Sequence, residues 1–308
     1  MTPVFPSPSS ADAAISVSGL SRHFGSRKAL DDVTLHVPRG SVFGLVGENG
    51  AGKTTLIRHM LGLLTPESGT VRVFGLNPVV DPVGVLGRIG YLSEVRDLPG
   101  WMTVGELLRY TRAFRPTWDS GFAEELRERF GLPGTQKIRA LSQGQTAKAG
   151  LLVALAFRPD LLVLDEPSSG LDPVVRRDIL EAIIRTVAED RRTVFFSSHL
   201  LDEIERVCDH VAMIRGGRVI LAGRLDDVKA SHRRLVLKFG EPQRVPPAMD
   251  HVLVLRGQAC DWTGVFQGDR PKLLKAVHAV GASVVEEEAP TLDEIFVAQV
   301  STAFGRSE

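Results

Sequence analysis

The sequence predicts an α/β fold with a mostly parallel central sheet that carries helices on both faces. Short apolar strands alternate with helices over residues 146–208, which is typical of strands buried in a parallel sheet. An earlier strand, 41–46, runs directly into a glycine-rich loop that opens a helix, and the strand at 161–164 ends in two adjacent acidic residues. At 308 residues, the chain is long enough for two domains of about 150 residues each.

The N-terminal part of the chain is expected to be rich in strands. Residues 1–14 are interrupted by prolines, which predicts a disordered lead. From Ile15 onward, short stretches alternate between apolar and polar residues. The elements expected here are strands at 16–19, 34–37 and 41–46, a helix at 54–64, and a glycine-punctuated hairpin at 67–74.

A helical block interrupts the strands over about residues 95–150. Thr103 and Glu106 have the spacing of a capping box, in which each side chain accepts a hydrogen bond from the other residue's backbone N–H. A second amphipathic helix is expected at 119–130, because a glycine and a proline follow it.

Strands and helices then alternate up to residue 224, where the main domain is expected to end. The elements expected in this part are helices at 146–157, 174–188 and 200–208, and strands at 161–164 and 193–197. An accessory α+β domain is expected at 225–308, with strands at 234–239, 251–256, 262–267 and 283–285 and helices at 271–280 and 292–300. The main domain is thus expected at 15–224.

The composition excludes several classes of protein. Lys plus Arg and Asp plus Glu both total 37, so there is no overall positive field, and no nucleic-acid partner is expected. Two cysteines supply neither a disulfide framework nor a four-ligand zinc site. No window offers the ~20 apolar residues of a membrane span, and the N-terminus lacks a secretory signal pattern. We therefore expect a cytoplasmic protein whose action on a membrane would need a partner.

The glycine-rich loop has the pattern G-x-x-x-x-G-K-[ST]. Small residues let successive backbone N–H groups surround phosphate oxygens, and the following helix directs its positive end at them. Lys53 would bridge the β- and γ-phosphates, and the Thr54 hydroxyl would be a ligand of Mg²⁺. The pattern predicts a P-loop NTPase core that binds a nucleoside triphosphate. The residues expected to bind it are Gly47, Glu48, Asn49, Gly50, Ala51, Gly52, Lys53, Thr54 and Thr55.

The acidic pair at the end of the strand 161–164 supplies the chemistry that this loop lacks. A buried strand that delivers a carboxylate at its carboxyl end is where α/β sheets place ligand chemistry. Asp165 would hold Mg²⁺ through water, and Glu166 would polarise the attacking water as a general base.

Three further segments distinguish among phosphoryl-transfer enzymes. They are Leu141–Gln145, which opens a helix about 20 residues before the acidic pair, then Ser169–Asp172, and then Ser198–His199. Their order and identity resemble the nucleotide-binding subunit of ATP-binding cassette (ABC) transporters over roughly residues 15–223. The resemblance implies ATP and Mg²⁺ as cofactors, and a P-loop core with a β subdomain and an inserted helical subdomain at about 95–150.

The resemblance also implies roles for individual residues. Phe24 would stack on adenine, although an early-strand core position is the alternative. Ser142, Gly144 and Gln145 would contact the γ-phosphate held by a second protomer, so that two chains enclose two ATP molecules. Asp172 would lie across that interface, and His199 would contact the γ-phosphate and the water at Glu166. A homodimer or a paired ABC ATPase subunit is therefore expected.

Two positions depart from the family pattern. Gln143 replaces a common glycine, and Glu94 replaces the usual glutamine whose carbonyl reaches Mg²⁺. Glu94 also offers an oxygen ligand, with a negative charge added, so we expect it near the metal. In the family the segment that follows meets the membrane subunit, and exposed Trp101 and Met102 would suit that contact. Packing within the helical block is the alternative.

The C-terminal stretch 289–296 resembles the accessory tail of ATPases that serve bacterial drug, peptide or polysaccharide exporters. Such a tail would stabilise a homodimer. Nothing in it has catalytic spacing, and the acidic run Glu286–Glu288 is expected to be solvated rather than to bind a metal.

The expected function is ATP hydrolysis by a subunit of a bacterial ABC exporter, in which dimer closure drives a separate integral membrane permease. Such a subunit would be peripheral on the inner face of the cell membrane. A soluble, non-transport ABC-type ATPase that acts on ribosomes or nucleic acid is the alternative, although the sequence shows neither a second cassette nor sustained heptads. A catalytically inactive cassette is disfavoured because Lys53, Asp165, Glu166 and His199 are all present.

Overall fold

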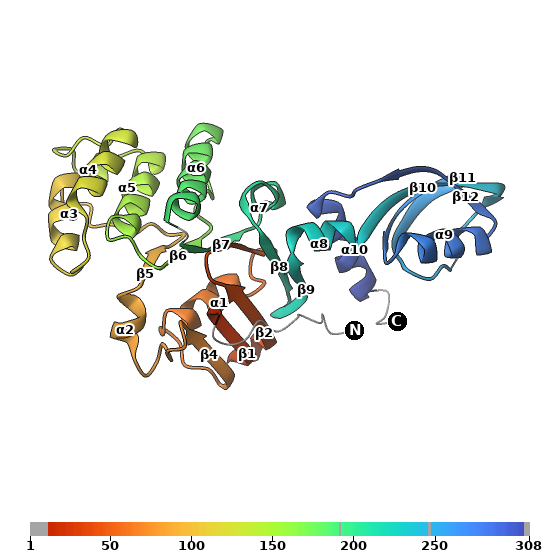
Figure 1. Cartoon of the computed structure of the whole chain (residues 1–308), viewed down its shortest axis with the longest axis horizontal. Helices are drawn as coiled ribbons and strands as arrows, with labels where there is room; N and C mark the ends of the chain where they lie inside the picture. Colours follow the sequence, from red (N-terminus) through yellow and green to blue (C-terminus); the bar gives the residue numbers. More distant parts are fainter. Residues whose placement is uncertain (1–11, 191, 246–247, 305–308) are drawn as a thin grey trace. The chain divides into compact units, whose positions relative to one another are not determined.

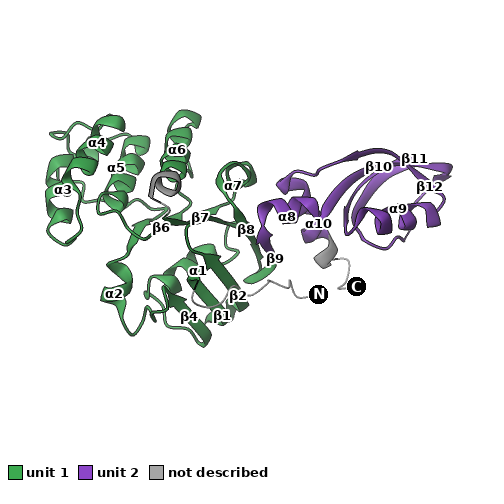
Figure 2. Cartoon of the chain, in the orientation of Figure 1, with its two compact units in different colours: residues 1–220 green, residues 221–308 purple. Residues whose placement is uncertain are grey.

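The computed structural model describes residues 12–190, 192–245 and 248–304, and its contacts divide the chain into two compact units. The first unit extends to Ile220 and the second begins at Leu221 (Figure 2). The division falls inside β9 (Arg218–Arg224), a few residues before the expected boundary at 224. Most of the expected lead, 1–11, lies outside the described residues.

The first unit contains a six-stranded sheet in the order β5-β6-β7-β3-β8-β9. The neighbours β5–β6, β6–β7, β7–β3 and β3–β8 are parallel, which confirms the predicted α/β fold. Its three central strands are buried at every residue, as their continuous apolar runs require. The strand bounds are β3 Val42–Val46, β5 Ile89–Leu92, β6 Leu161–Asp165, β7 Thr193–Ser198 and β8 His210–Arg215.

An antiparallel sheet in the order β2-β1-β4 completes the strands of this unit (Figure 1). Its strands are β1 Ala13–Phe24, β2 Arg27–Pro38 and β4 Ser68–Val73. Two expectations need correction here. The strand β1 begins at Ala13 rather than after residue 14, because Ala13 pairs with Pro38. The segment 67–74 is not a hairpin of its own, because β4 pairs with β1.

The helices begin where the sequence supplies caps. Thr103 and Glu106 form the predicted capping box, with the Thr103 N–H donating to Glu106 Oε2 at 2.7 Å and the Glu106 N–H donating to Thr103 Oγ1 at 3.2 Å. Asp119 caps the next helix through the Phe122 N–H. The helix bounds in this unit are α1 Lys53–Met60, α2 Pro82–Leu86, α3 Val104–Arg112, α4 Ser120–Arg129, η1 Ile138–Ala140, α5 Gln143–Leu155, α6 Pro173–Asp190 and α7 Leu201–Val207.

The helices α3, α4 and α5 pack together, and α5 also packs on β5 (Figure 1). At that contact Gly90 of β5 faces the backbone of α5, and a Cβ at this position would lie 2.2 Å from the Ala154 carbonyl oxygen. Before α3, Trp101 is 69% exposed but Met102 is only 6% exposed. The expectation that both are exposed is therefore wrong for Met102, whose backbone carbonyl also accepts a hydrogen bond from the Ile138 N–H.

The second unit is a small α+β structure with its own core. Its sheet has the order β11-β10-β12, with both pairs antiparallel. The segments expected as two strands at 251–256 and 262–267 fall within β11, which folds back so that the Gln267 N–H donates to the His251 carbonyl. The bounds are α8 Leu225–Ala230, β10 His232–Gln243, β11 Val252–Gln267, α9 Arg270–Ala279, β12 Ala282–Glu288 and α10 Leu292–Phe304. The core contains Leu235, Leu237, Phe239, Trp262, Phe266, Leu273, Val277 and Ala282.

Among the described residues, no helix has the length and apolar character needed to cross a membrane.

We expect Gly90→Ala to destabilise the first unit, because the added Cβ would collide with the α5 backbone. Overpacking of this kind typically costs about 1–3 kcal/mol, so the midpoint of urea unfolding should fall. Gly134→Ala is the matched control, since a Cβ there has nothing within 4 Å. Equal midpoints for the two variants would show that α5 and β5 are not in close contact at this position.

Candidate active site

The phosphate loop adopts a backbone path that its glycines permit. Gly50 and Gly52 have φ values of 78° and 114°, in the left-handed region that disfavours other residues. Gly47 lies against β8, where a Cβ would be 2.3 Å from the Ile214 carbonyl oxygen. The helix α1 begins at Lys53 with Gly52 as its N-cap, so the loop ends at the positive end of a helix.

Lys53, the first residue of α1, is buried, and its side chain reaches back to the loop. Its Nζ donates to the carbonyl oxygens of Gly47 at 2.5 Å and Glu48 at 3.2 Å. It also lies 3.0 Å from Glu166 Oε1, although this oxygen has no partner with hydrogen-bond geometry among the described residues. The loop's cation and the candidate base are therefore direct neighbours.

Asp165, the last residue of β6, lies next to the end of the phosphate loop. Its Oδ1 accepts a hydrogen bond from Ser197 Oγ at 2.8 Å, and the Thr54 hydroxyl also donates to its side chain. Burial raises the pKa of Asp165 above its ordinary value, while these hydrogen bonds lower it. The structure thus brings together two of the three expected metal ligands.

Glu166 has a strained backbone and a fixed side chain. Its φ of 49° is unusual for a residue other than glycine, and its N–H donates to the carbonyl oxygen of Ser197 at 3.2 Å and to its Oγ at 3.1 Å. His199 donates to Glu166 Oε2 from Nδ1 at 2.6 Å and from its backbone N–H at 3.3 Å. The expected catalytic residues Lys53, Glu166 and His199 therefore form one contiguous group.

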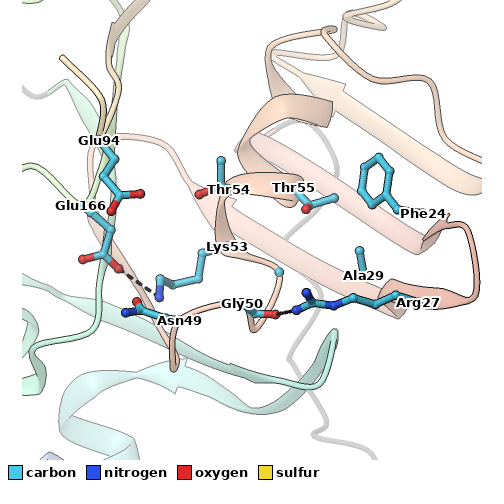
Figure 3. Close-up of a pocket in the computed structure, with 11 residues that line it drawn as sticks. Phe24, Arg27, Ala29, Asn49, Gly50, Lys53, Thr54, Thr55, Glu94 and Glu166 are labelled. Atoms are coloured by element: carbon cyan, nitrogen blue, oxygen red, sulfur yellow. Dashed lines mark hydrogen bonds and ion pairs between the residues drawn. The ribbon is translucent and has the colours of Figure 1, made fainter. Parts of the chain in front are cut away.

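A pocket of about 420 Å³ runs along the phosphate loop (Figure 3). Figure 3 shows Glu94 and Glu166 at one end, Lys53 and Thr54 in the middle, and Phe24 at the other end. Phe24 is 45% exposed, so the alternative of a core position is wrong. The lining residues are Phe24, Arg27, Ala29, Asn49, Gly50, Gly52, Lys53, Thr54, Thr55, Glu94 and Glu166.

Seven expected nucleotide-binding residues are absent from this lining. Three belong to the phosphate loop, namely Gly47, Glu48 and Ala51, and the other four lie later in the chain. Ser142 and Gln145 form a capping box at the start of α5, with hydrogen bonds of 3.0 and 3.1 Å between their side chains and backbones. Gly144 packs closely against Val175 of α6. Asp172 caps the start of α6 by accepting hydrogen bonds from the N–H groups of the residues at 174 and 175. Within one chain these residues do not join the pocket.

Several residues of the site were not expected from the sequence. Arg27 and Ala29 line the pocket, and Arg27 donates to the Gly50 carbonyl oxygen at 2.8 Å. Ser197 makes hydrogen bonds with both Asp165 and Glu166. None of these three positions belongs to a motif. The only signal in the sequence is that Arg27 and Ala29 follow Phe24 closely along the chain, and that Ser197 lies two residues before His199.

Arg96 is a further unexpected contact of the site. Its buried guanidinium donates to the carbonyl oxygens of Pro167 at 2.9 Å and Ser169 at 2.8 Å. It thereby joins the segment that carries Glu94 to the loop that follows Glu166.

Comparison with known proteins gives consistent matches. Residues 30–169 match the family described as ABC transporter. The bacitracin transport ATP-binding protein BcrA of Bacillus licheniformis is 35% identical over 223 residues, which cover 71% of this chain and 72% of that protein. The daunorubicin resistance ATP-binding protein DrrA3 of Streptomyces coeruleorubidus is 33% identical over 305 residues, which cover 93% of this chain and 96% of that protein.

A solved structure described as the ATP-binding subunit of an ABC transporter superposes with a TM-score of 0.64 at 30% identity, covering 70% of this chain and 92% of that one. The resemblance predicted from the motifs is therefore confirmed, and the P-loop core belongs to the fold seen in that subunit. Taken with the pocket and its adjoining acids, these matches show that the chain belongs to the ABC transporter family, as an ATP-binding subunit that hydrolyses ATP.

Proposed function

We propose that this ATPase serves a bacterial exporter of drug-like or peptide compounds, bound to an integral membrane permease at the inner face of the cell membrane. The names of BcrA and DrrA3 refer to bacitracin transport and daunorubicin resistance. The match to DrrA3 extends over both units of this chain, which supports the exporter branch over a soluble, non-transport ATPase. The sequence contains no feature that selects a cargo, because the cargo is bound by the permease.

The order of groups along the pocket supports a single orientation of ATP. The aromatic ring of Phe24 would stack on the adenine. The glycines and Lys53 in the middle would hold the triphosphate, which places the γ-phosphate at the end where Glu166 lies (Figure 3). This proximity of Glu166 to Lys53, at 3.0 Å, is the observation that carries the proposal.

Mg²⁺ fits the residues present. Hard oxygen donors converge at Thr54 and Asp165, and Glu94 adds another in the pocket lining. Burial disfavours the charged form of Asp165, and a nearby divalent cation would offset that cost. When bound, Mg²⁺ would neutralise charge that develops on the phosphates.

Glu166 would act as the general base in hydrolysis. Its Oε1 is buried beside Lys53 Nζ at 3.0 Å, without hydrogen-bond geometry, and would accept a hydrogen bond from the attacking water once Lys53 binds the triphosphate. His199 would hold the carboxylate through Oε2 and, since its ring is 39% exposed, would contact the γ-phosphate through its other nitrogen. In this proposal Oε2 fixes the position of the carboxylate, and Oε1 acts on the attacking water.

Ser142, Gly144, Gln145 and Asp172 would act on the nucleotide of a second protomer. They do not line the pocket of their own chain, and the N-terminus of α5 would present backbone N–H groups to a γ-phosphate. Two chains would then enclose two ATP molecules, in a homodimer or with a paired ABC subunit.

Purification of the tagged chain from native membranes tests the transport function. We expect a multi-span membrane protein to co-purify in stoichiometric amount. Recovery with ribosomes or DNA, and with no membrane protein, would favour the alternative function and contradict the proposal.

A chain that ends at Arg224 should keep its affinity for ATP, because every residue that lines the pocket lies before that position. Titration with a fluorescent ATP analogue should give a Kd within a few-fold of the full chain. Lys53→Ala in the truncated chain is the control and should lose binding. A folded truncation that binds no nucleotide would contradict the proposed domain organisation.

Glu94→Gln restores the residue usual in the family and should leave the Kd for ATP within a few-fold. Lys53 and the phosphate loop carry most of the binding, and glutamine keeps an oxygen in place. Glu94→Ala should lower permease-stimulated turnover more than basal turnover. A collapse of ATP binding in Glu94→Gln would instead identify the carboxylate as a primary ligand.

Glu166→Gln should slow hydrolysis by about 10²–10⁴, because the change removes basicity while it keeps the size of the side chain. ATP binding should survive, so the variant should accumulate as an ATP-bound dimer in size-exclusion chromatography with Mg²⁺. Adding Ser142→Arg to the same chain should abolish that dimer. Normal hydrolysis by Glu166→Gln would rule out the base assignment, and a monomer with bound ATP would rule out the two-chain arrangement.

A further inference from the structure

A buried carboxylate outside every motif lies next to the catalytic group. Glu203 of α7 is fully buried, and its Oε2 accepts hydrogen bonds from Ser168 Oγ at 2.7 Å and Ser198 Oγ at 3.0 Å. Arg176 of α6 lies 3.2 Å from its Oε1. Burial raises the pKa of Glu203, and the two hydroxyls and Arg176 act in the opposite direction. A buried acid is costly to retain unless it makes such contacts.

The two serines belong to the two segments that carry the reacting groups. Ser168 is two residues after Glu166, and Ser198 directly precedes His199. Both hydroxyls are buried and meet on the same oxygen of Glu203. Glu203 therefore joins the two segments behind the contact of 2.6 Å between Glu166 and His199.

The hydrogen bonds of Glu203 lie close to a strained part of the backbone at Glu166. Glu166 has a φ of 49°, and such a conformation persists only when the surrounding structure determines it. Arg96, in the segment after β5, donates to the carbonyl oxygens of the loop after Glu166. Glu203 of α7 accepts a hydrogen bond from the Ser168 hydroxyl in the same loop. The Ser198 hydroxyl also accepts the N–H of Leu200 at 3.0 Å, so the turn after His199 is fixed by the same group.

We infer that Glu203 is a positioning residue for ATP hydrolysis. It keeps Glu166 and His199 in their relative positions because it accepts hydrogen bonds from both Ser168 and Ser198. The inference rests on the proposed roles of Glu166 and His199. Glu203 does not line the nucleotide pocket, so its loss should change kcat rather than the affinity for ATP. A misplacement of reacting groups by about 1 Å can cost about 10²-fold in rate.

The test compares Glu203→Met with Glu203→Gln in the full chain, with phosphate release and ATP binding measured separately. Methionine fills a similar volume but binds neither hydroxyl, so kcat should fall about 10- to 100-fold while the Kd for ATP stays within about threefold. Glutamine can accept from one hydroxyl and donate to the other, so it should restore kcat to within about threefold. Asp202→Ala, which removes the exposed neighbouring acid on α7, is the matched control and should keep kcat.

Two outcomes would overturn the inference. One is a Glu203→Met kcat within about threefold of the unsubstituted chain, and the other is an equal loss in the glutamine and methionine variants. If Glu203→Met does not fold, Ser198→Ala retains the acid and removes one of the two ties, and kcat should then fall about fivefold or more at constant Kd. An unchanged kcat in Ser198→Ala would also refute the inference.

Glu166→Gln, assayed in parallel, separates this inference from the proposed function. Normal hydrolysis by Glu166→Gln would remove the proposed base whatever Glu203 does. A slow Glu166→Gln together with an active Glu203→Met would leave the proposed function intact and refute only the role of Glu203.

Discussion

The register of three neighbouring parallel strands determines the geometry of the whole site. Val46, the last residue of β3, pairs with Ser198 of β7, and Asp165, the last residue of β6, pairs with Ser197. The three strands therefore end at one level, and the residues that follow them start from a single edge of the sheet. A slip of one residue would direct each side chain to the opposite face and would separate Lys53 from Glu166.

The parts of this arrangement that could be predicted from the sequence are those that lie close together along the chain. The phosphate loop, the acidic pair and the Thr103 capping box each combine a residue pattern with one local element, so backbone geometry alone links pattern to structure. Continuous apolar runs likewise predicted the buried strands β3, β6 and β7. Residue roles that depend on a second protomer remain predictions.

The parts that could not be predicted depend on contacts between distant segments. No local pattern indicates that β8 supplies the Ile214 carbonyl that requires glycine at position 47, or that β4 pairs with β1 rather than within its own segment. Met102 is buried because the loop before η1 returns to it. Glu203 is one of three acids on the short helix α7, and only the folded chain brings it to both serines.

The balance of charge at this edge of the sheet links the resting contacts to the proposed chemistry. Asp165, Glu166 and Glu203 are all buried, and Lys53 is the buried cation that contacts Glu166. A triphosphate in the pocket would compete for the same ammonium group, because Lys53 cannot satisfy both partners fully. In the proposed mechanism, binding of ATP therefore draws Lys53 away from Glu166 Oε1, while His199 continues to hold Oε2. The oxygen that acts as the base becomes available when the γ-phosphate arrives, so hydrolysis depends on the same charge that binds the substrate.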